Sequence, residues 1–524
     1  MDTGGNDDDR AAGPSDGSPS LERQRREEDR KRLAREVARR RASHFATFGG
    51  SEDPQTSGAD SVQVGGDSAR TLGPWNTAYQ LADAKRDAKR KREESLLANR
   101  RESDSVGACY ASWTPRKKVA RSSRIPTLKS QARELCASLI AHVSTLGGVP
   151  DDVRADLAWE VCRIRKMTDD VFMKLFTADA GSSISIDDCS LIEEDTMRSA
   201  LREAIHPGLN ELRLDLCGRG FTDKVTRGLA HEDDVTFAGL EKLVLGGAYR
   251  LTDDGAEHLL KLAPALRTLG LQNCSRIEGR VVHCLPELTP KLTSLDLSFC
   301  GGIPRESLRS ALAKLDQLDS LTLDGIAEVD DELLAAEDVL HGIRNVGVLS
   351  LRNTKLTDVG LRRLAASLRT LHSISLDYCT ITSSGVIDMV DACPGLTSVS
   401  LKKCTMVGDA AVVHLMGKVD LEKLVLNGIG KGLTGASVEA IVCGRGRSLT
   451  ELDLSWCRHV PERAIGYLIE SLPNLKTIKL FGCNQLRKDF ASVVRNDDVA
   501  IVGLDAVCED PLAQMAARGR RIVR

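Results

Sequence analysis

Fifteen cysteines and ten histidines are the residues of this 524-residue chain with the most specific chemistry, because thiolates and imidazoles bind metals and thiols form disulfides. No two cysteines stand at the Cys-x-x-Cys spacing typical of structural zinc sites. Cysteines that occur one per repeat do not converge on one point, so these are predicted to be small buried side chains, and we expect neither a metal nor a disulfide. Eight of them recur at one position of a repeat: Cys189, Cys217, Cys274, Cys300, Cys379, Cys404, Cys457 and Cys483.

A phosphate-binding loop or a catalytic triad would indicate an enzyme, and neither pattern fits this chain. The segment Gly428-Ile-Gly-Lys-Gly-Leu-Thr434 has the composition of a phosphate-binding loop. It lacks the Gly-x-x-x-x-Gly-Lys-(Ser/Thr) spacing that cradles a phosphate. The sequence contains no His-Glu-x-x-His and no Gly-x-Ser-x-Gly, and its histidines do not cluster. We therefore expect a binding protein without cofactors rather than an enzyme.

The recurring cysteines end a repeated pattern, Leu-x-x-Leu-x-Leu-x-x-Cys. Its alternating leucines predict a short strand with one buried face. Stretches such as Thr357–Leu368 have apolar residues at helical spacing, so each strand is expected to be followed by a returning helix. The oxygens of Thr252-Asp253, Thr357-Asp358 and Ser383-Ser384 are placed to cap such helices. The pattern occurs at Leu209–Cys217, Leu266–Cys274, Leu292–Cys300, Leu371–Cys379, Leu396–Cys404, Leu449–Cys457 and Leu475–Cys483, and copies starting at Leu240, Leu318, Val346 and Leu421 replace the cysteine by Ala248, Ile326, Thr354 and Ile429.

Repeats of this kind cannot bury their apolar faces alone, so neighbouring repeats stack and share one core. The sequence therefore predicts an α/β fold, a leucine-rich-repeat solenoid of horseshoe shape with about 12 repeats of ~26 residues over residues 182–510. A first repeat is expected around Ile184–Cys189, and a degenerate last repeat around Val499–Leu504.

The outward-facing strand positions of the repeats form the predicted concave face, which is the candidate binding site for a protein target. Aromatic residues make up only 3% of the chain, yet three occupy one repeat position beside this face. Exposed aromatics are typical of binding hot spots, but the same rings could instead pack against the neighbouring loop. Charges of both signs favour a protein partner over nucleic acid. The candidate residues are Asp296, Phe299, Arg352, Asp377, Tyr378, Lys402, Asp453 and Trp456.

Residues 126–181 precede the repeats and are predicted to form three helices. The first runs from Leu128 to about Thr145, the second follows Val149-Pro150, and the third spans Thr168–Phe176. Proline and acidic residues at the start of the second helix suit a helix N-terminus. Two interpretations stay open: a cap over the first repeat, or a binding segment for an adaptor protein.

Residues 1–125 form a charged tail with little apolar periodicity, which predicts disorder. Residues 1–129 hold 26 basic and 20 acidic residues, whereas residues 130–524 hold 46 and 55. Two basic clusters resemble nuclear import signals, although such runs also occur as solubilising tails. We expect nuclear localisation, only indirect or non-specific contact with DNA, and no membrane segment. The import candidates are Lys85, Arg86, Lys89, Arg90, Lys91, Arg92, Arg116, Lys117 and Lys118, and a second basic tail covers residues 511–524.

At its cysteine-bearing positions the chain resembles the repeats of F-box/leucine-rich-repeat proteins, and Val149-Pro150-x-x-Val is similar to the opening of an F-box. A closer resemblance is to the leucine-rich-repeat subunit of the damage-recognition complex in global-genome nucleotide excision repair. It covers Ile125-Pro-Thr-Leu, Leu135-Cys136, Val149-Pro150-Asp-Asp-Val-Arg, Cys162-Arg-x-Arg-Lys-Met167 and Ile186-Asp-Asp-Cys-Ser-Leu-Ile-Glu-Glu194 leading into Leu214-Asp-Leu-Cys-Gly-Arg219.

These resemblances imply a substrate- or damage-recognition subunit of a cullin-type ubiquitin ligase, with elongin C or a Skp-type protein as adaptor and a Swi/Snf-type ATPase as a further partner. Elongin C binders carry Leu-x-x-x-Cys-x-x-x-(aliphatic) on a helix, and here Cys136 and Ile140 match while Ala132 stands at the leucine position. The adaptor-binding candidates are Leu135, Cys136, Ile140, Val149 and Pro150. The alternative function is a leucine-rich-repeat scaffold without a ligase.

Overall fold

The computed structural model of this chain describes residues 86–87, 90–91, 109–110, 112–115, 127–177, 181–204, 206–230, 237–487 and 489–504. The chain divides into two compact units, Met1–Ala98 and Asn99–Arg524. In the first unit the described residues are helical, and Arg90 lies 3.3 Å from Asp87. All the elements below belong to the second unit.

Short strands in the second unit form one parallel sheet whose strand order follows the sequence from β1 to β13. Adjacent strands are in register, so that the buried central residues, such as Leu295 and Leu321, stand side by side. The strands are β1 Ser183–Ile186, β2 Glu211–Leu214, β3 Lys242–Leu245, β4 Thr268–Gly270, β5 Ser294–Asp296, β6 Ser320–Thr322, β7 Val348–Ser350, β8 Ser373–Ser375, β9 Ser398–Ser400, β10 Lys423–Val425, β11 Glu451–Asp453, β12 Thr477–Lys479 and β13 Ala500–Val502.

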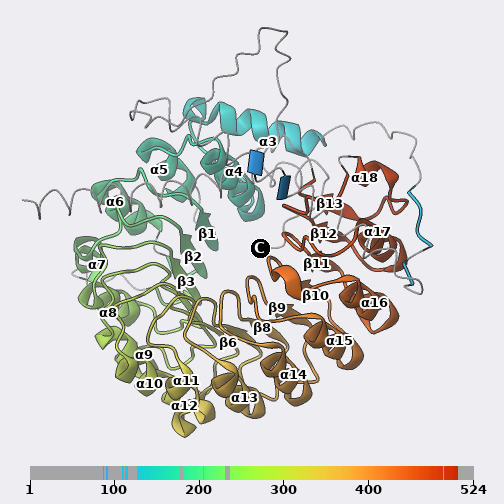
Figure 1. Cartoon of the computed structure of the whole chain (residues 1–524). Helices are drawn as coiled ribbons and strands as arrows, with labels where there is room; N and C mark the ends of the chain where they lie inside the picture. Colours follow the sequence, from blue (N-terminus) through green and yellow to red (C-terminus); the bar gives the residue numbers. More distant parts are fainter. Residues whose placement is uncertain are drawn as a thin grey trace, which may run out of the picture. The chain divides into compact units, whose positions relative to one another are not determined.

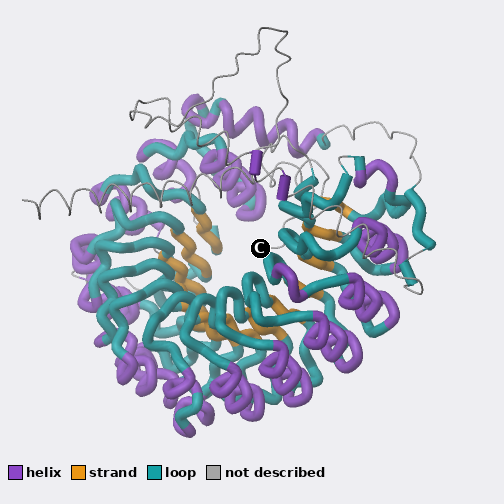
Figure 2. The backbone as a smooth tube through the Cα atoms, in the orientation of Figure 1, coloured by secondary structure: helices purple, strands orange, loops and turns teal. Residues whose placement is uncertain are grey.

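The helices of this unit lie outside the arc that the strands line (Figures 1 and 2). They are α3 Leu128–Ser138, α4 Asp151–Arg163, α5 Asp169–Thr177, α6 Glu194–Ala204, α7 Asp223–Ala230, α8 Asp253–Leu262, α9 Arg280–Leu288, α10 Arg305–Lys314, α11 Asp331–Leu334, α12 Glu337–Gly342, α13 Asp358–Ser367, α14 Ser383–Ala392, α15 Asp409–Lys418, α16 Gly435–Cys443, α17 Glu462–Ser471 and α18 Phe490–Val493. Three 3-10 turns, η1 Ile140–His142, η2 Gly430–Gly432 and η3 Gly446–Ser448, complete the list. None of the helices in the described part of the chain is long and apolar enough to cross a membrane.

The predicted leucine-rich-repeat solenoid is confirmed, including its first repeat at β1 and its last at β13. Leucines of the strands and apolar residues of the returning helices together form one continuous core. Each repeat is too thin to bury these side chains alone, and stacking supplies the missing half of the core.

The repeat cysteines are buried within this core, and all of them except Cys189 place the thiol against a main-chain carbonyl of an adjacent repeat. The Cys300 thiol lies 2.8 Å from the carbonyl oxygen of Leu271, and the Cys457 thiol lies 3.1 Å from that of Leu426. Burial raises the pKa of Cys300 to about 11 and that of Cys457 to about 12. The thiols therefore stay protonated at neutral pH and act as weak donors between repeats.

The residues that cap the N-termini of the helices agree only in part with those predicted from the sequence. The Thr357 hydroxyl accepts from the Val359 amide at 3.3 Å, as expected for a cap. The cap of α14 is Thr382, however, and not the predicted Ser383. Thr252 begins α8 without such a bond, and its hydroxyl donates instead to Asp223 of the preceding repeat at 2.8 Å.

The segment in front of the repeats forms three helices, as predicted, but the first is shorter than expected. It ends at Ser138 and is followed by η1 rather than continuing to Thr145. The 3-10 turn buries Ile140 in the core, whereas Leu135 and Cys136, in the last turn of the helix before it, are exposed. The second and third helices, α4 and α5, lie where they were expected.

Candidate functional site

The chain takes a left-handed turn just after the strand in nearly every repeat, and these positions form the rim of the concave face. The backbone φ is 59° at Phe299, 63° at Tyr378 and 65° at Trp456. Such values are normal for glycine and uncommon for other residues. We call this set the rim row; it consists of Leu216, Gly247, Asn273, Phe299, Gly325, Asn353, Tyr378, Lys403, Gly428, Trp456 and Gly482.

Two of the aromatic side chains of the rim row lie over the glycine of the next repeat. A Cβ atom on Gly482 would come within 2.6 Å of the Trp456 indole, and one on Gly325 would overlap the Phe299 ring. Phe299 is nevertheless 50% exposed and Tyr378 is 51% exposed. Phe299 therefore combines packing on one side with an open surface on the other, so for this ring the two interpretations are compatible.

Cations accompany two of these rings. The Lys402 ammonium lies 5.6 Å from the centre of the Tyr378 ring, and the Arg458 guanidinium lies 5.1 Å from that of Trp456. Both distances are within the range of a cation–π interaction. The cations hold the rings in place without covering the whole of their surface.

The predicted concave carboxylates have a structural role, because they accept hydrogen bonds from main-chain amides of their own loop or of the next repeat. Asp377 is 6% exposed and accepts from the Lys402 amide at 2.9 Å. Asp296 accepts from the Ser298 amide at 2.9 Å, and Asp453 from the Ser455 amide at the same distance. These aspartates position the rim; Asp377 is buried, whereas Asp296 and Asp453 are half-buried.

Asp324 belongs to the same group and was not singled out as a binding candidate. It accepts from the Ser350 hydroxyl at 2.7 Å and from the Arg352 amide at 2.8 Å, and burial raises its pKa. The Arg352 side chain bridges Asp324 and Asp377 with Nε–O distances of 3.7 and 3.5 Å, and it is 49% exposed. The occurrence of Asp at one strand position in several repeats is the signal that would have identified this set.

The accessible part of the predicted binding face is therefore smaller than expected. We call it the rim surface; it consists of Phe299, Arg352, Tyr378, Lys402 and Trp456. It is aromatic and cationic, whereas the buried aspartates lie beneath it.

A second candidate surface lies on α3, whose apolar side chains face outward. Leu128 is 82% exposed, Leu135 61% and Leu139 48%, and Ala132 and Cys136 are also exposed. Their spacing of four, three, one and three residues places them on one side of a helix. Exposed leucines in such a row are typical of a surface that a partner covers. We call this row the α3 face.

The other predicted adaptor residues lie elsewhere. Ile140 is 1% exposed and packs into the core at η1, so it does not extend the α3 face. Pro150 precedes the first turn of α4, and Val149 is partly buried beside it. The helical spacing of Leu128 and Leu139 was the signal that would have added these two residues to the prediction.

Ion pairs hold α3 against α4. The buried carboxylate of Glu160 lies 3.7 Å from Arg133 of α3 and accepts from Arg163 at 3.0 Å. Arg133 also lies 5.5 Å from the Trp159 ring. One side of α3 is thus attached to the front segment, while the α3 face stays open.

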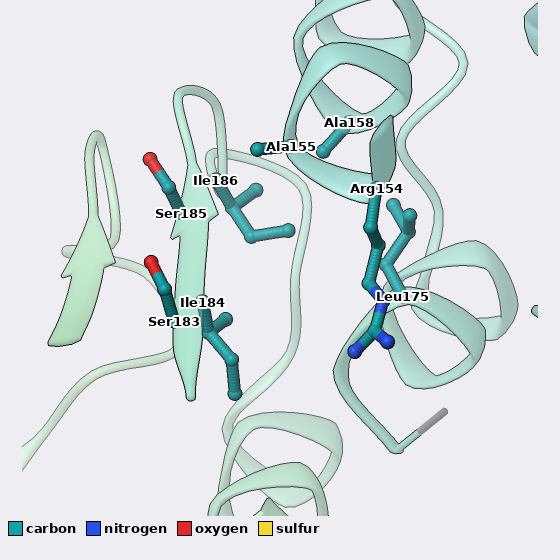
Figure 3. A pocket seen from close by; sticks show the side chains of 8 residues that line it. All are labelled: Arg154, Ala155, Ala158, Leu175, Ser183, Ile184, Ser185 and Ile186. Carbon is teal, nitrogen blue, oxygen red and sulfur yellow. The ribbon is translucent and has the colours of Figure 1, made fainter. Parts of the chain in front are cut away.

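The pocket shown in Figure 3 lies between α4, α5 and β1 and has room for about one water molecule. Ile184 and Ile186 point toward the helices, whereas Ser183 and Ser185 point to the other side of the strand (Figure 3). Arg154 donates to the Val149 carbonyl at 3.0 Å. The pocket is too small for an organic ligand.

The predicted import residues Arg86, Arg90 and Lys91 are exposed and helical. The others, Lys85, Lys89, Arg92, Arg116, Lys117 and Lys118, lie outside the described residues, as does the predicted basic tail 511–524.

Comparison with known proteins gives relatives in DNA repair, although no family model matches the chain. It is 26% identical to the DNA repair protein rhp7 of Schizosaccharomyces pombe over 71% of this chain and 67% of that protein. It is 26% identical to the DNA repair protein RAD7 of Saccharomyces cerevisiae over 65% of this chain and 60% of that protein. The matches thus span about three fifths to two thirds of these relatives' lengths.

Among solved structures, the crystal structure of the Rad7 and Elc1 complex from yeast contains a chain that is 20% identical, with a TM-score of 0.46 over 83% of this chain and 98% of that chain. The chain described here is thus a leucine-rich-repeat protein, and it is homologous to the DNA repair proteins rhp7 and RAD7.

Proposed function

We propose that this chain is a target- or damage-recognition subunit of a ubiquitin ligase that acts in nucleotide excision repair. In this proposal the α3 face binds an adaptor of the elongin C or Skp type, and the adaptor connects the chain to a cullin. The rim surface binds the protein target. The relatives named as DNA repair proteins support the repair role.

The exposed α3 face is the observation that carries the adaptor proposal. Burial by a partner would stabilise the complex by roughly 1.5–3 kcal/mol for each of the exposed leucines Leu128, Leu135 and Leu139. The ion pair between Arg133 and Glu160 attaches another side of α3 to the front segment, so a partner can cover the α3 face without displacing the helix. Cys136, at the centre of that face, is the position where the elongin C pattern has its cysteine.

The rim surface suits a protein target rather than a small molecule. Phe299, Tyr378 and Trp456 belong to repeats three apart, which separates neighbouring rings by about 14 Å at ~4.8 Å per strand. A row of that length fits an extended segment or a flat surface. The aromatic and cationic side chains favour a target with acidic and apolar residues.

The wider assembly follows from the same proposal. A Swi/Snf-type ATPase would be a further partner, contact with DNA would be indirect or non-specific, and the complex would act in the nucleus. The basic residues Arg86, Arg90 and Lys91 are exposed, as a nuclear import signal requires.

Substitution of Leu135 by Asp tests the adaptor proposal. A charge at this exposed position should abolish binding of purified elongin C and co-purification of a cullin from cells, because an aspartate would have to be buried without a partner. The thermal melt should be unchanged, since Leu135 packs against little of its own chain. The matched control is Leu191→Asp, an equally apolar residue that is 56% exposed and lies outside α3.

Elongin C and cullin that bind Leu135→Asp as well as wild type would contradict the assignment of the α3 face. If the wild-type chain binds neither an elongin C nor a Skp-type adaptor, the non-ligase scaffold is favoured, with the front helices acting only as a cap.

A further inference from the structure

A short segment in front of α3 packs on the far end of the solenoid. Tyr110 and Trp113 of this segment are each only 5% exposed. The segment is drawn in blue beside α17 and α18 in Figure 1. The Cys109 amide donates to the Glu439 carboxylate of α16 at 2.8 Å, across 330 residues of sequence.

Two helices carry glycine where the aromatic side chains of this segment rest. A Cβ atom on Gly466, in the middle of α17, would overlap the Trp113 indole. A Cβ atom on Gly435, the first residue of α16, would overlap the Tyr110 hydroxyl. Glycine inside a helix is less stable than alanine, so Gly466 is better explained by this contact than by the needs of α17.

The indole also reaches the last helix of the solenoid. The centres of the Trp113 and Phe490 rings are 6.3 Å apart, and Phe490 is fully buried. Terminal repeats have a neighbour on one side only and need a cover to protect their core. The segment therefore lies over three consecutive repeats at the end where such a cover is required.

We propose that Cys109–Pro115 is an intramolecular clasp that binds the outer face of α16, α17 and α18 and ties the two ends of the solenoid together. Thr127 caps α3 at the other end of the sheet order, where its hydroxyl accepts from the Ser130 amide at 3.2 Å. Twelve residue steps separate Pro115 from Thr127, and a fully extended chain of that length spans at most about 40 Å. While the clasp is bound, the front helices and the last repeats cannot move further apart than this. The proposal is independent of the adaptor and of the target.

The clasp is built to be reversible rather than permanent. Within the described part of the chain, no group accepts a hydrogen bond from the buried Trp113 indole N–H. An unpaired buried donor weakens the bound state relative to the released state, in which water accepts that bond.

Hydrogen–deuterium exchange of the full chain, followed by mass spectrometry, tests the clasp with Gly466→Ala. The added methyl group should displace the indole and speed amide exchange in Cys109–Pro115 and in α17–α18 at least tenfold. The matched control is Gly417→Ala in α15, because a Cβ atom there would meet nothing within 4 Å. This control should leave exchange of the clasp unchanged.

The sign of the effect separates the clasp from a local effect on α17. Alanine favours a helix over glycine, so an effect confined to α17 would slow its exchange rather than speed it. Trp113→Ala should reproduce the faster exchange, and adding Gly466→Ala to Trp113→Ala should bring no further increase, because the two residues act through one contact. Fast exchange of Cys109–Pro115 in the wild type, or no change in Gly466→Ala, would overturn the proposal.

The Cys109 thiol gives a second readout. Burial, with Cys443 and Glu439 nearby, raises its pKa to about 11 from a usual value of 9.0. Release should restore the thiolate fraction and increase the rate of Cys109 alkylation by iodoacetamide at pH 7.5 at least tenfold in Gly466→Ala relative to Gly417→Ala. Equal rates in the two variants would contradict the clasp.

Discussion

The rim row shows how one backbone conformation, repeated just after the strands, organises packing between neighbouring repeats. A left-handed residue other than glycine costs roughly 1–2 kcal/mol, yet Phe299, Tyr378 and Trp456 all adopt it. The conformation turns two of the rings onto the next repeat, where glycine leaves room for them. Large residues and glycines at the rim are thus paired between neighbours.

This pairing predicts that Gly482→Ala destabilises the protein by about 1–3 kcal/mol, because φ is 66° and the new methyl group would meet the Trp456 ring at 2.6 Å. Urea unfolding would measure the loss. Gly301→Ala is the control, since a Cβ atom there would meet nothing within 4 Å and its φ is not positive. If both variants unfold at the same urea concentration, the indole does not rest on Gly482.

The helices are tied to one another at their N-termini by repeated Asp–Thr pairs. Asp409 at the start of α15 accepts from both the amide and the hydroxyl of Thr434, at 2.9 and 2.7 Å. Asp358 of α13 binds Thr382 in the same way. Carboxylates at helix N-termini also interact favourably with the helix dipole. Each pair therefore sets the position of one helix relative to the next.

Loss of one such pair should be measurable in a thermal or urea melt. Asp358→Ala removes two hydrogen bonds to a carboxylate and is expected to lower the free energy of unfolding by about 2–3 kcal/mol. Asp388→Ala is the control, because it removes only the exposed ion pair with Arg362 and should cost about 1 kcal/mol or less. Equal losses in the two variants would argue against a role for the Asp–Thr pairs in stacking.

Across the whole molecule, the buried thiols link stability to pH. The pKa of Cys300 is raised to about 11 and that of Cys457 to about 12, both mainly by burial. The unfolded chain releases these protons near the usual value of 9.0, while the folded chain still holds them. The contribution of these thiols to the free energy of unfolding is therefore fully present below about pH 9. It is lost as the pH rises through their folded-state pKa values.

Cys300→Ala should make this alkaline loss shallower. The pKa of Cys300 rises from 9.0 in the unfolded chain to about 11 in the folded chain. Such a thiol should lower the free energy of unfolding by about 1 kcal/mol between pH 8 and pH 10. Urea unfolding of wild type and variant at both pH values would measure the difference in slope. Identical losses would mean that the Cys300 thiol ionises as readily in the folded chain as in the unfolded one.

The buried residues of the repeats could be predicted because equivalent residues in neighbouring repeats have the same surroundings. Local alternation of apolar residues predicts the leucines of the strands and the inward cysteines. Equivalent positions of neighbouring repeats pack on one another, which predicts the returning helices as well. One repeat therefore predicts the environment of the next, and the prediction held from Ile184 to Leu504.

Other features depended on distant contacts. Whether Asp377 faced a partner or the Lys402 amide depended on the next repeat's loop, and whether Ile140 faced outward depended on where α3 ended. Neither the two-residue alternation of a strand nor the 3.6-residue period of a helix carries information on such neighbours.

The sequence by itself therefore determined the solenoid, its approximate limits and the identity of its buried layers, since these arise from short-range pattern repeated many times. Only the tertiary structure decided which charged side chains stay accessible and that the α3 face is uncovered. It also placed Tyr110 and Trp113 on Gly435 and Gly466, more than 300 residues away. The physical reason is that packing of a non-repeated segment is set by shape complementarity between residues distant in sequence, and no periodicity encodes it.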